Sequence, residues 1–145
     1  MSLRGAGLLE IDAIARYQAL IALDLDGNAL RSLAPLSALP CLEELSLREN
    51  ALRVLNAEYF PRLVHLSVAA NDLESLENLH CLTRLERLDC AGNRLAALDV
   101  RPLARLQHLN CGYNRIEQLL LGDALRICSC ASNLLRELAI PPLLT

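Results

Sequence analysis

Residues 42–52 read LEELSLRENAL, and the same frame of apolar residues around one asparagine recurs along the chain. The frame aligns on six asparagines at intervals of 22, 21, 22, 21 and 19 residues: Asn28, Asn50, Asn71, Asn93, Asn114 and Asn133. Its apolar positions are mostly Leu, with Val, Ile or Cys in some copies. Leu makes up about a quarter of the chain, far above ordinary usage. The sequence therefore predicts a repeat protein, in which each unit buries its apolar face against its neighbours.

The two halves of each repeat differ in the spacing of their apolar residues. Alternation in the first half, as at Leu45 and Leu47, predicts a short strand with one buried face. In the second half every third residue is apolar, as from Leu30 to Leu42, which favours 3₁₀ turns or extended segments over an α-helix. We expect the strands to form a parallel sheet. Each asparagine amide should donate to and accept from backbone groups where the chain leaves its strand.

This LxxLxLxxNxL pattern resembles that of the leucine-rich repeat family over the whole chain. The resemblance implies an α/β solenoid that curves as a right-handed superhelix, with the parallel sheet on its concave face and 3₁₀ or extended segments on its convex face. Repeats of 21–22 residues resemble the intracellular class found in protein-phosphatase regulators and ciliary proteins. Residues 110–114 and 125–133 resemble repeats of the PH-domain leucine-rich-repeat protein phosphatases, and residues 141–144, Pro-Pro-Leu-Leu, resemble bacterial effector repeats.

The repeats predict one domain over residues 1–145, with units that begin near residues 20, 42, 63, 85, 106 and 125. Residues 1–19 fit a partial repeat in which Ala6 replaces the asparagine. At the other end, Leu143 or Leu144 would open a further repeat. Neither end carries a polar capping element, which terminal repeats normally need. We expect a domain open at both ends, as part of a longer solenoid or covered by a partner, with end-to-end packing as one way to cover it.

Composition excludes several classes of function. The net charge is −3 and no basic block occurs, which argues against a nucleic-acid partner. Charges interrupt every apolar stretch, so no membrane span is expected. The N-terminus lacks the apolar region of a signal peptide, and the six cysteines are the only feature typical of a secreted chain. We therefore expect a cytoplasmic protein with reduced thiols and no cofactor.

Residues 20–28 read LIALDLDGN and resemble the DxDG strand of haloacid-dehalogenase-type phosphatases, in which the first aspartate is a nucleophile beside Mg²⁺. The repeat frame already accounts for Leu23, Leu25 and Asn28. No doubly wound helix pattern follows to complete such a site. We interpret Asp24 and Asp26 as outward strand positions and predict no catalytic residue.

Cysteines occupy one apolar column of the later repeats: Cys90, Cys111 and Cys130, with Cys128 on the same face. Packing as small apolar groups, a disulfide and a zinc site are three readings of this column. Neighbouring parallel strands place such sulfurs about 4.8 Å apart with parallel side chains, which favours packing. We predict no metal ligand.

His65 and His108 project from the third position of their repeats, with Arg87 between them. The histidines are roughly 10 Å apart, too far to share one metal ion. The row is either a solvated basic stripe or part of a binding surface.

Outward strand positions on the concave face are left free by the fold. The candidate protein-binding residues there are Asp24, Asp26, Glu44, Arg48, His65, Arg87, Asp89, His108, Asn110 and Tyr113. The first two repeats are mainly acidic and the later floor is small, interrupted by Tyr113. We expect a protein partner that carries basic residues at its N-terminal end, with Tyr113 as an anchor. Contact through an edge or the convex face is the alternative. As alternatives to an interaction module, the chain would be the substrate-targeting segment of a larger enzyme such as a protein phosphatase, or a bacterial effector-type repeat protein.

Overall fold

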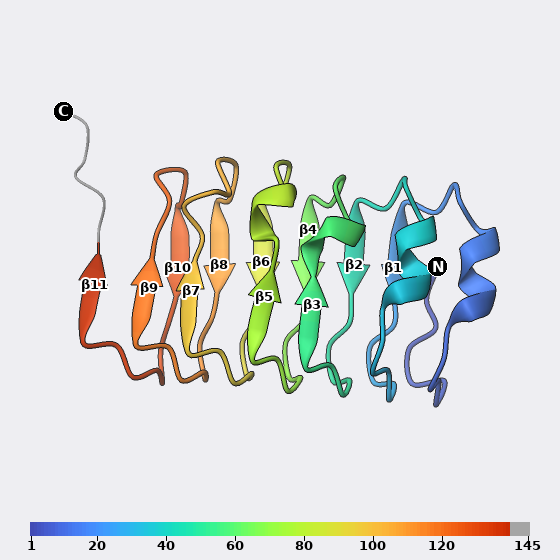
Figure 1. The fold of residues 1–145 in the computed structure, drawn as a ribbon, viewed down its shortest axis with the longest axis horizontal. Helices are drawn as coiled ribbons and strands as arrows, with labels where there is room; N and C mark the ends of the chain where they lie inside the picture. The colour runs from blue at the N-terminus through green and yellow to red at the C-terminus, as the bar shows by residue number, and fades with distance from the viewer. Residues whose placement is uncertain (140–145) are drawn as a thin grey trace.

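The computed structural model of the chain describes residues 1–139, with side chains to residue 136. One short strand from each repeat enters a six-stranded parallel sheet, in the order β1-β2-β4-β6-β8-β10. These strands are β1 (Ala22–Asp24), β2 (Glu44–Ser46), β4 (His65–Ser67), β6 (Arg87–Asp89), β8 (His108–Asn110) and β10 (Ile127–Ser129). Figure 1 shows the repeats side by side along the long axis in chain order. The predicted α/β solenoid with a parallel sheet is confirmed.

The opposite layer combines 3₁₀ turns with further strands, and it lies in front of the six-stranded sheet in Figure 1. The 3₁₀ turns are η1 (Asp12–Arg16), η2 (Ala34–Ala38), η3 (Ala57–Tyr59) and η4 (Leu79–Cys81). Strand β3 (Val54–Asn56) pairs with β5 (Ser75–Glu77), and β9 (Gln118–Leu120) lies between β7 (Ala97–Asp99) and β11 (Glu137–Ala139). The sequence predicts 3₁₀ or extended segments here. The structure adds that the extended ones pair in parallel.

The first residues of the chain continue the hydrogen bonding of the six-stranded sheet. Ser2 forms a parallel bridge with Asp24, and the N–H of Leu3 donates to the Asp24 carbonyl at 2.8 Å. The N–H of Gly5 donates to the carbonyl of Asp26 at 2.8 Å. Residues 1–3 therefore lie beside β1 as a further extended segment, and a turn at residues 4–5 follows it. The expected further repeat at Leu143 or Leu144 lies outside the described residues.

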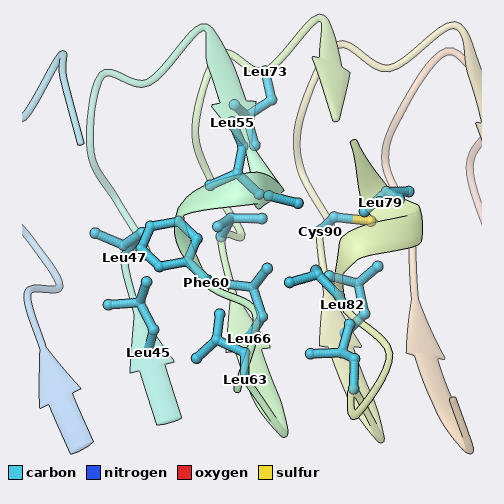
Figure 2. Packing of buried hydrophobic residues seen from close by; sticks show 14 of the residues in the cluster. Leu45, Leu47, Leu55, Phe60, Leu63, Leu66, Leu73, Leu79, Leu82 and Cys90 are labelled. Atoms are coloured by element: carbon cyan, nitrogen blue, oxygen red, sulfur yellow. The ribbon is translucent and has the colours of Figure 1, made fainter. Parts of the chain in front are cut away.

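Leucines from both layers fill the space between them and form one continuous core along the solenoid. Figure 2 shows Leu45 and Leu66 of the six-stranded sheet, Leu55 of the opposite layer, and the ring of Phe60 between them. Phe60 is 1% exposed and packs edge-on against Tyr59, with ring centroids 6.0 Å apart. Burying each such side chain contributes about 1.5–3 kcal/mol. Stacking of repeats therefore supplies most of the stability.

The six frame asparagines join each repeat to the one before it. At Asn71 the side-chain Oδ1 accepts from the N–H of Leu52 at 3.1 Å. Its Nδ2 donates to the carbonyls of Leu47 at 2.8 Å and Val68 at 3.0 Å. The other five asparagines make the same bonds one repeat apart. The amide both donates and accepts, and backbone groups at each turn find partners.

The residue before each frame asparagine has a left-handed backbone, and these residues form one row that we call the rim. The rim consists of Gly27, Glu49, Ala70, Gly92, Tyr113 and Ser132, with φ between 54° and 65°. This conformation lets the N–H of Ala70 donate to the carbonyl of Ala91 at 2.8 Å in the next repeat. Only glycine adopts such a φ without steric cost. The sequence does not predict the rim, because four of its six residues are not glycine.

Candidate functional site

The outward face of the six-stranded sheet is hollowed into an open groove of about 680 Å³, which we call the concave groove. It crosses all six strands and is lined by residues from each of them. Eight of the ten candidate residues line it, namely Asp24, Glu44, Arg48, His65, Arg87, Asp89, His108 and Asn110. Asp26 and Tyr113 do not. The alternation predicted from the sequence therefore brings most of the candidates to one surface.

Two rows of side chains form the floor of the concave groove, because each three-residue strand points its first and third residues outward. The strand registers place Ala22, Glu44, His65, Arg87, His108 and Ile127 in the first row. They place Asp24, Ser46, Ser67, Asp89, Asn110 and Ser129 in the second row. Neighbours within a row lie about 4.8 Å apart. The first row carries the histidines and Arg87, and the second row is small and polar.

Asp26 is buried instead of facing outward as the sequence suggests. It is 6% exposed, and its Oδ1 accepts from the Ser46 hydroxyl at 2.6 Å and from the N–H of Arg48 at 2.8 Å. The Asp26 N–H donates to Asp24 at 3.0 Å and is the main reason that the pKa of the Asp24 carboxyl is lowered; the Ser2 hydroxyl adds to this. Strand β1 ends at Asp24, so the prediction that Asp26 occupies an outward strand position is wrong. Both carboxylates stabilise the first turns of the solenoid.

Two further acidic residues of the second repeat lie beside basic side chains of the same chain. Glu43 lies 3.5 Å from Arg84, and Glu44 lies 3.5 Å from Nδ1 of His65. The sequence predicts an acidic patch in the first two repeats that attracts a basic partner. These pairs reduce the charge that the patch presents to a partner.

Arg48 reaches across a neighbouring strand. Its Nη1 lies 3.1 Å from Oδ2 of Asp89, although Arg48 follows β2, Asp89 belongs to β6, and β4 runs between them. The hydroxyl of Ser67, which the strand register places between Ser46 and Asp89, is buried and has no hydrogen-bond partner within the described part of the chain. The Arg48–Asp89 ion pair thus crosses the centre of the groove floor. Ser67, whose hydroxyl lacks a hydrogen-bond partner in the described part of the chain, lies on the strand between the two residues.

Arg87 and His108 are basic side chains of the groove floor that remain accessible. Arg87 is exposed and His108 is half-buried. The register places His65, Arg87 and His108 on three successive strands, in the order that the sequence predicts. Within residues 1–136, neither Arg87 nor His108 forms an ion pair. His65, Arg87 and His108 therefore form a row of nitrogen-bearing side chains at the centre of the groove. Arg87 is the permanently charged member of this row.

Tyr113 stands on the rim beside the groove. It is 70% exposed, with φ 55°, and its N–H donates to the carbonyl of Ala131 at 2.8 Å. Its rim neighbours, Gly92 and Ser132, are small. The exposed side chain of Tyr113 therefore belongs to the rim, and not to the groove floor on which the sequence places it.

The cysteine column divides between core and surface. Cys90 and Cys111 are buried, Cys130 is half-buried, and Cys128 is exposed because β10 is the last strand of the sheet. Burial raises the pKa of Cys90 well above its usual value and that of Cys111 to about 12. All six cysteines are free thiols. Among residues 1–139, no group of three or more His, Cys, Asp or Glu side chains is arranged to hold a metal ion.

Within the same residues, none of the helices is long and apolar enough to cross a membrane.

No protein-family model and no curated protein sequence matches this chain. Solved structures do match. One chain of the LRIM1/APL1C complex is 26% identical with a TM-score of 0.79, over 94% of this chain and 31% of that one. The APL1 leucine-rich repeat domain is 26% identical with a TM-score of 0.75, over 94% of this chain and 44% of that one. Internalin C2 of Listeria monocytogenes is 24% identical with a TM-score of 0.75, over 85% of this chain and 57% of that one.

This chain thus spans 31% to 57% of the length of these three proteins. The resemblance of the later repeats to PH-domain leucine-rich-repeat protein phosphatases finds no support in them. Their shared feature is the leucine-rich repeat solenoid. Together with the LxxLxLxxNxL frame and the hydrogen-bonded asparagines, they identify the fold of the chain as a leucine-rich repeat solenoid.

Proposed function

We propose that the chain is a protein-interaction module that binds its partner in the concave groove. The main support for this proposal is the groove itself, an open surface across six strands. Its polar side chains lie outside the apolar core. The fold fixes the leucine, asparagine and rim positions, and it leaves the two floor rows free for recognition. The LRIM1/APL1C structure is itself a complex, which supports this kind of role for a similar solenoid.

Tyr113 is the aromatic anchor in this proposal. Aromatic side chains that project beside a depression are enriched among residues that dominate binding energy. Its ring is 70% exposed and stands between small rim neighbours, which leaves room for a partner to pack on both of its sides. Contacts would then run from the groove floor to the rim at β8.

We further propose that the protein works in a reducing compartment. Its six cysteines are thiols, and two of them, Cys90 and Cys111, replace leucine in the core. Buried thiols behave as small apolar groups and contribute packing without needing a bonded partner.

Affinity purification with four single variants tests the role of the concave groove. Tyr113→Ala changes the rim, and Asn110→Trp fills the groove floor. Tyr17→Ala and Gln18→Trp make comparable changes at exposed positions directly after η1, in the opposite layer. A partner recovered with the natural chain should be lost with the first pair and kept with the second. Retention by all four variants, or loss only with the second pair, would contradict binding in the groove.

A further inference from the structure

We propose that the centre of the concave groove recognises an acidic side chain of the protein partner, which binds Arg87 between His65 and His108. This inference rests on the proposed function and adds the chemistry of the partner. The acidic composition of the first repeats suggests a basic partner. The partner side chain proposed here has the opposite charge.

The charges on the floor of the groove carry the inference. Arg48 is paired with Asp89 at 3.1 Å, and Glu44 is paired with His65 at 3.5 Å. Asp24 accepts hydrogen bonds from Ser2 and from the backbone. The guanidinium of Arg87 is permanently charged, and the described residues supply no counter-ion for it. An anionic group of the partner would supply that counter-ion.

The shape of the site suits a carboxylate. A guanidinium presents a planar fork of donors that matches two carboxylate oxygens. His108 lies on the next strand, about 4.8 Å away, and adds an imidazole on one side of Arg87. Asn110, exposed in the second row, has no acceptor for its Nδ2 among residues 1–136 and supplies a further donor. All three donors line the concave groove, on the neighbouring strands β6 and β8.

Selection from a random twelve-residue peptide library tests the inference without a known partner. The protein has a net charge of −3, so nonspecific attraction favours basic peptides, and enrichment of acidic ones would be specific to a local site. The library is panned at pH 6, and enriched peptides are synthesised. Each is compared with a version in which Asn and Gln replace Asp and Glu. Fluorescence anisotropy gives the dissociation constants at the same pH.

We expect the enriched peptides to contain an acidic residue whose replacement weakens binding at least about tenfold. Arg87→Gln should cause a similar loss, and combining it with the neutral peptide should add little, because both changes remove one contact. Arg62→Gln is the matched control, exposed and outside the groove lining. His108→Gln, beside Arg87, should weaken binding severalfold because it removes the imidazole donor. His80→Gln, on η4, should leave binding unchanged.

The outcomes separate this inference from the proposed function. Asn110→Trp fills the groove at an exposed position without adding charge. Peptides that lose binding to Asn110→Trp, yet bind equally well without acidic residues or to Arg87→Gln, would overturn the acidic-partner inference and leave the groove intact as the binding site. Peptides that are indifferent to Asn110→Trp, or a selection that yields no binding peptide, would count against both.

Discussion

Arg48 and Asp89 are joined by an ion pair of 3.1 Å between two repeats that are not neighbours. This pair connects repeats two and four over repeat three. Glu43 and Arg84 form a second pair, at 3.5 Å, between the start of repeat two and the last residue of repeat three. The backbone hydrogen bonds of the sheet connect each repeat only to its neighbours, but long side chains can link repeats that are not adjacent. The Arg48–Asp89 pair forms such a link on the floor of the proposed binding groove.

Removal of this ion pair should have little effect on stability. The side chains of Arg48 and Asp89 are 48% and 25% exposed, and exposed pairs contribute about 0–1 kcal/mol. Arg48→Met, Asp89→Asn and the double variant give a mutant cycle by urea unfolding. We expect a coupling energy below about 1 kcal/mol. A coupling above about 2 kcal/mol would show that the pair is structural and that Arg48 is not free to rearrange on binding.

The asparagine links should matter far more. In Asn93→Ala, the N–H of Leu73 loses its acceptor at 3.0 Å and the carbonyls of Val68 and Cys90 lose a donor, all in a buried environment. Buried groups left unsatisfied cost about 1–3 kcal/mol each, partly relieved by water, so we expect about 3 kcal/mol in urea unfolding. Asn56→Ala, which removes a cap of η3, is the control and should cost about 1 kcal/mol. Equal losses would contradict a special role for the frame asparagines.

The rim conformation predicts a pair of opposite substitutions. Ala70 has φ 55°, and a left-handed backbone destabilises a non-glycine residue by about 1–2 kcal/mol. Glycine avoids this strain, but its greater conformational entropy in the unfolded state offsets up to about 1 kcal/mol of the gain. Ala70→Gly should therefore raise the free energy of unfolding by about 0.5 kcal/mol. Gly92→Ala, at φ 65°, should lower it by a similar amount, since a Cβ there meets neighbours only at 3.6 Å.

Ala51→Gly is the control for the rim, because Ala51 does not have a positive φ. It should destabilise by up to about 1 kcal/mol. If Ala70→Gly destabilised as much as Ala51→Gly does, the left-handed assignment of the rim would be wrong.

Thiol reactivity should separate the buried and exposed cysteines. A pKa of about 12 leaves Cys111 with only about one thiolate in ten thousand at pH 8, and Cys90 is fully buried. Iodoacetamide at pH 8 should therefore modify Cys128 much faster than Cys90 or Cys111, as read by mass spectrometry of peptides. In urea all six cysteines should react. Equal rates for Cys111 and Cys128 in the folded protein would contradict the packing of the column.

The same burial gives stability a pH dependence. Because the folded pKa of Cys111 is raised, the unfolded thiol ionises first, and this favours the unfolded state above about pH 9. The stability due to the neutral thiol is complete below that pH and is lost progressively up to about pH 12. Cys111→Val should show a shallower decline than the natural chain in urea unfolding at pH 8, 9 and 10.

The sequence predicts those parts of the fold that depend on local periodicity. Leu45 and Leu47 alternate because a strand has a period of two, and Asn71 marks a turn because an amide satisfies both kinds of backbone group. The order His65, Arg87, His108 follows from repeat spacing alone. Each of these features needs only the register of one repeat on the next.

Features that depend on where the pattern stops, or on side-chain reach, are not predictable in this way. Asp26 continues the alternation in sequence, but the chain leaves the strand before it, and its carboxylate is buried against Ser46 and the backbone of Arg48 in the next repeat. Tyr113 follows the strand by three residues and stands on the rim. The pairing of Arg48 with Asp89 spans 41 residues and depends on a rotamer, which no periodicity specifies.

Nuclear magnetic resonance mapping tests the central claim, binding in the concave groove, most directly. The isotopically labelled chain is titrated with a peptide selected as above, or with its partner once recovered, and backbone and histidine side-chain signals are followed. We predict that the largest shifts fall on Glu44, His65, Arg87 and His108, while η1 to η4 stay unchanged. Shifts confined to the opposite layer or to the β10 edge, with the groove signals unmoved, would contradict it.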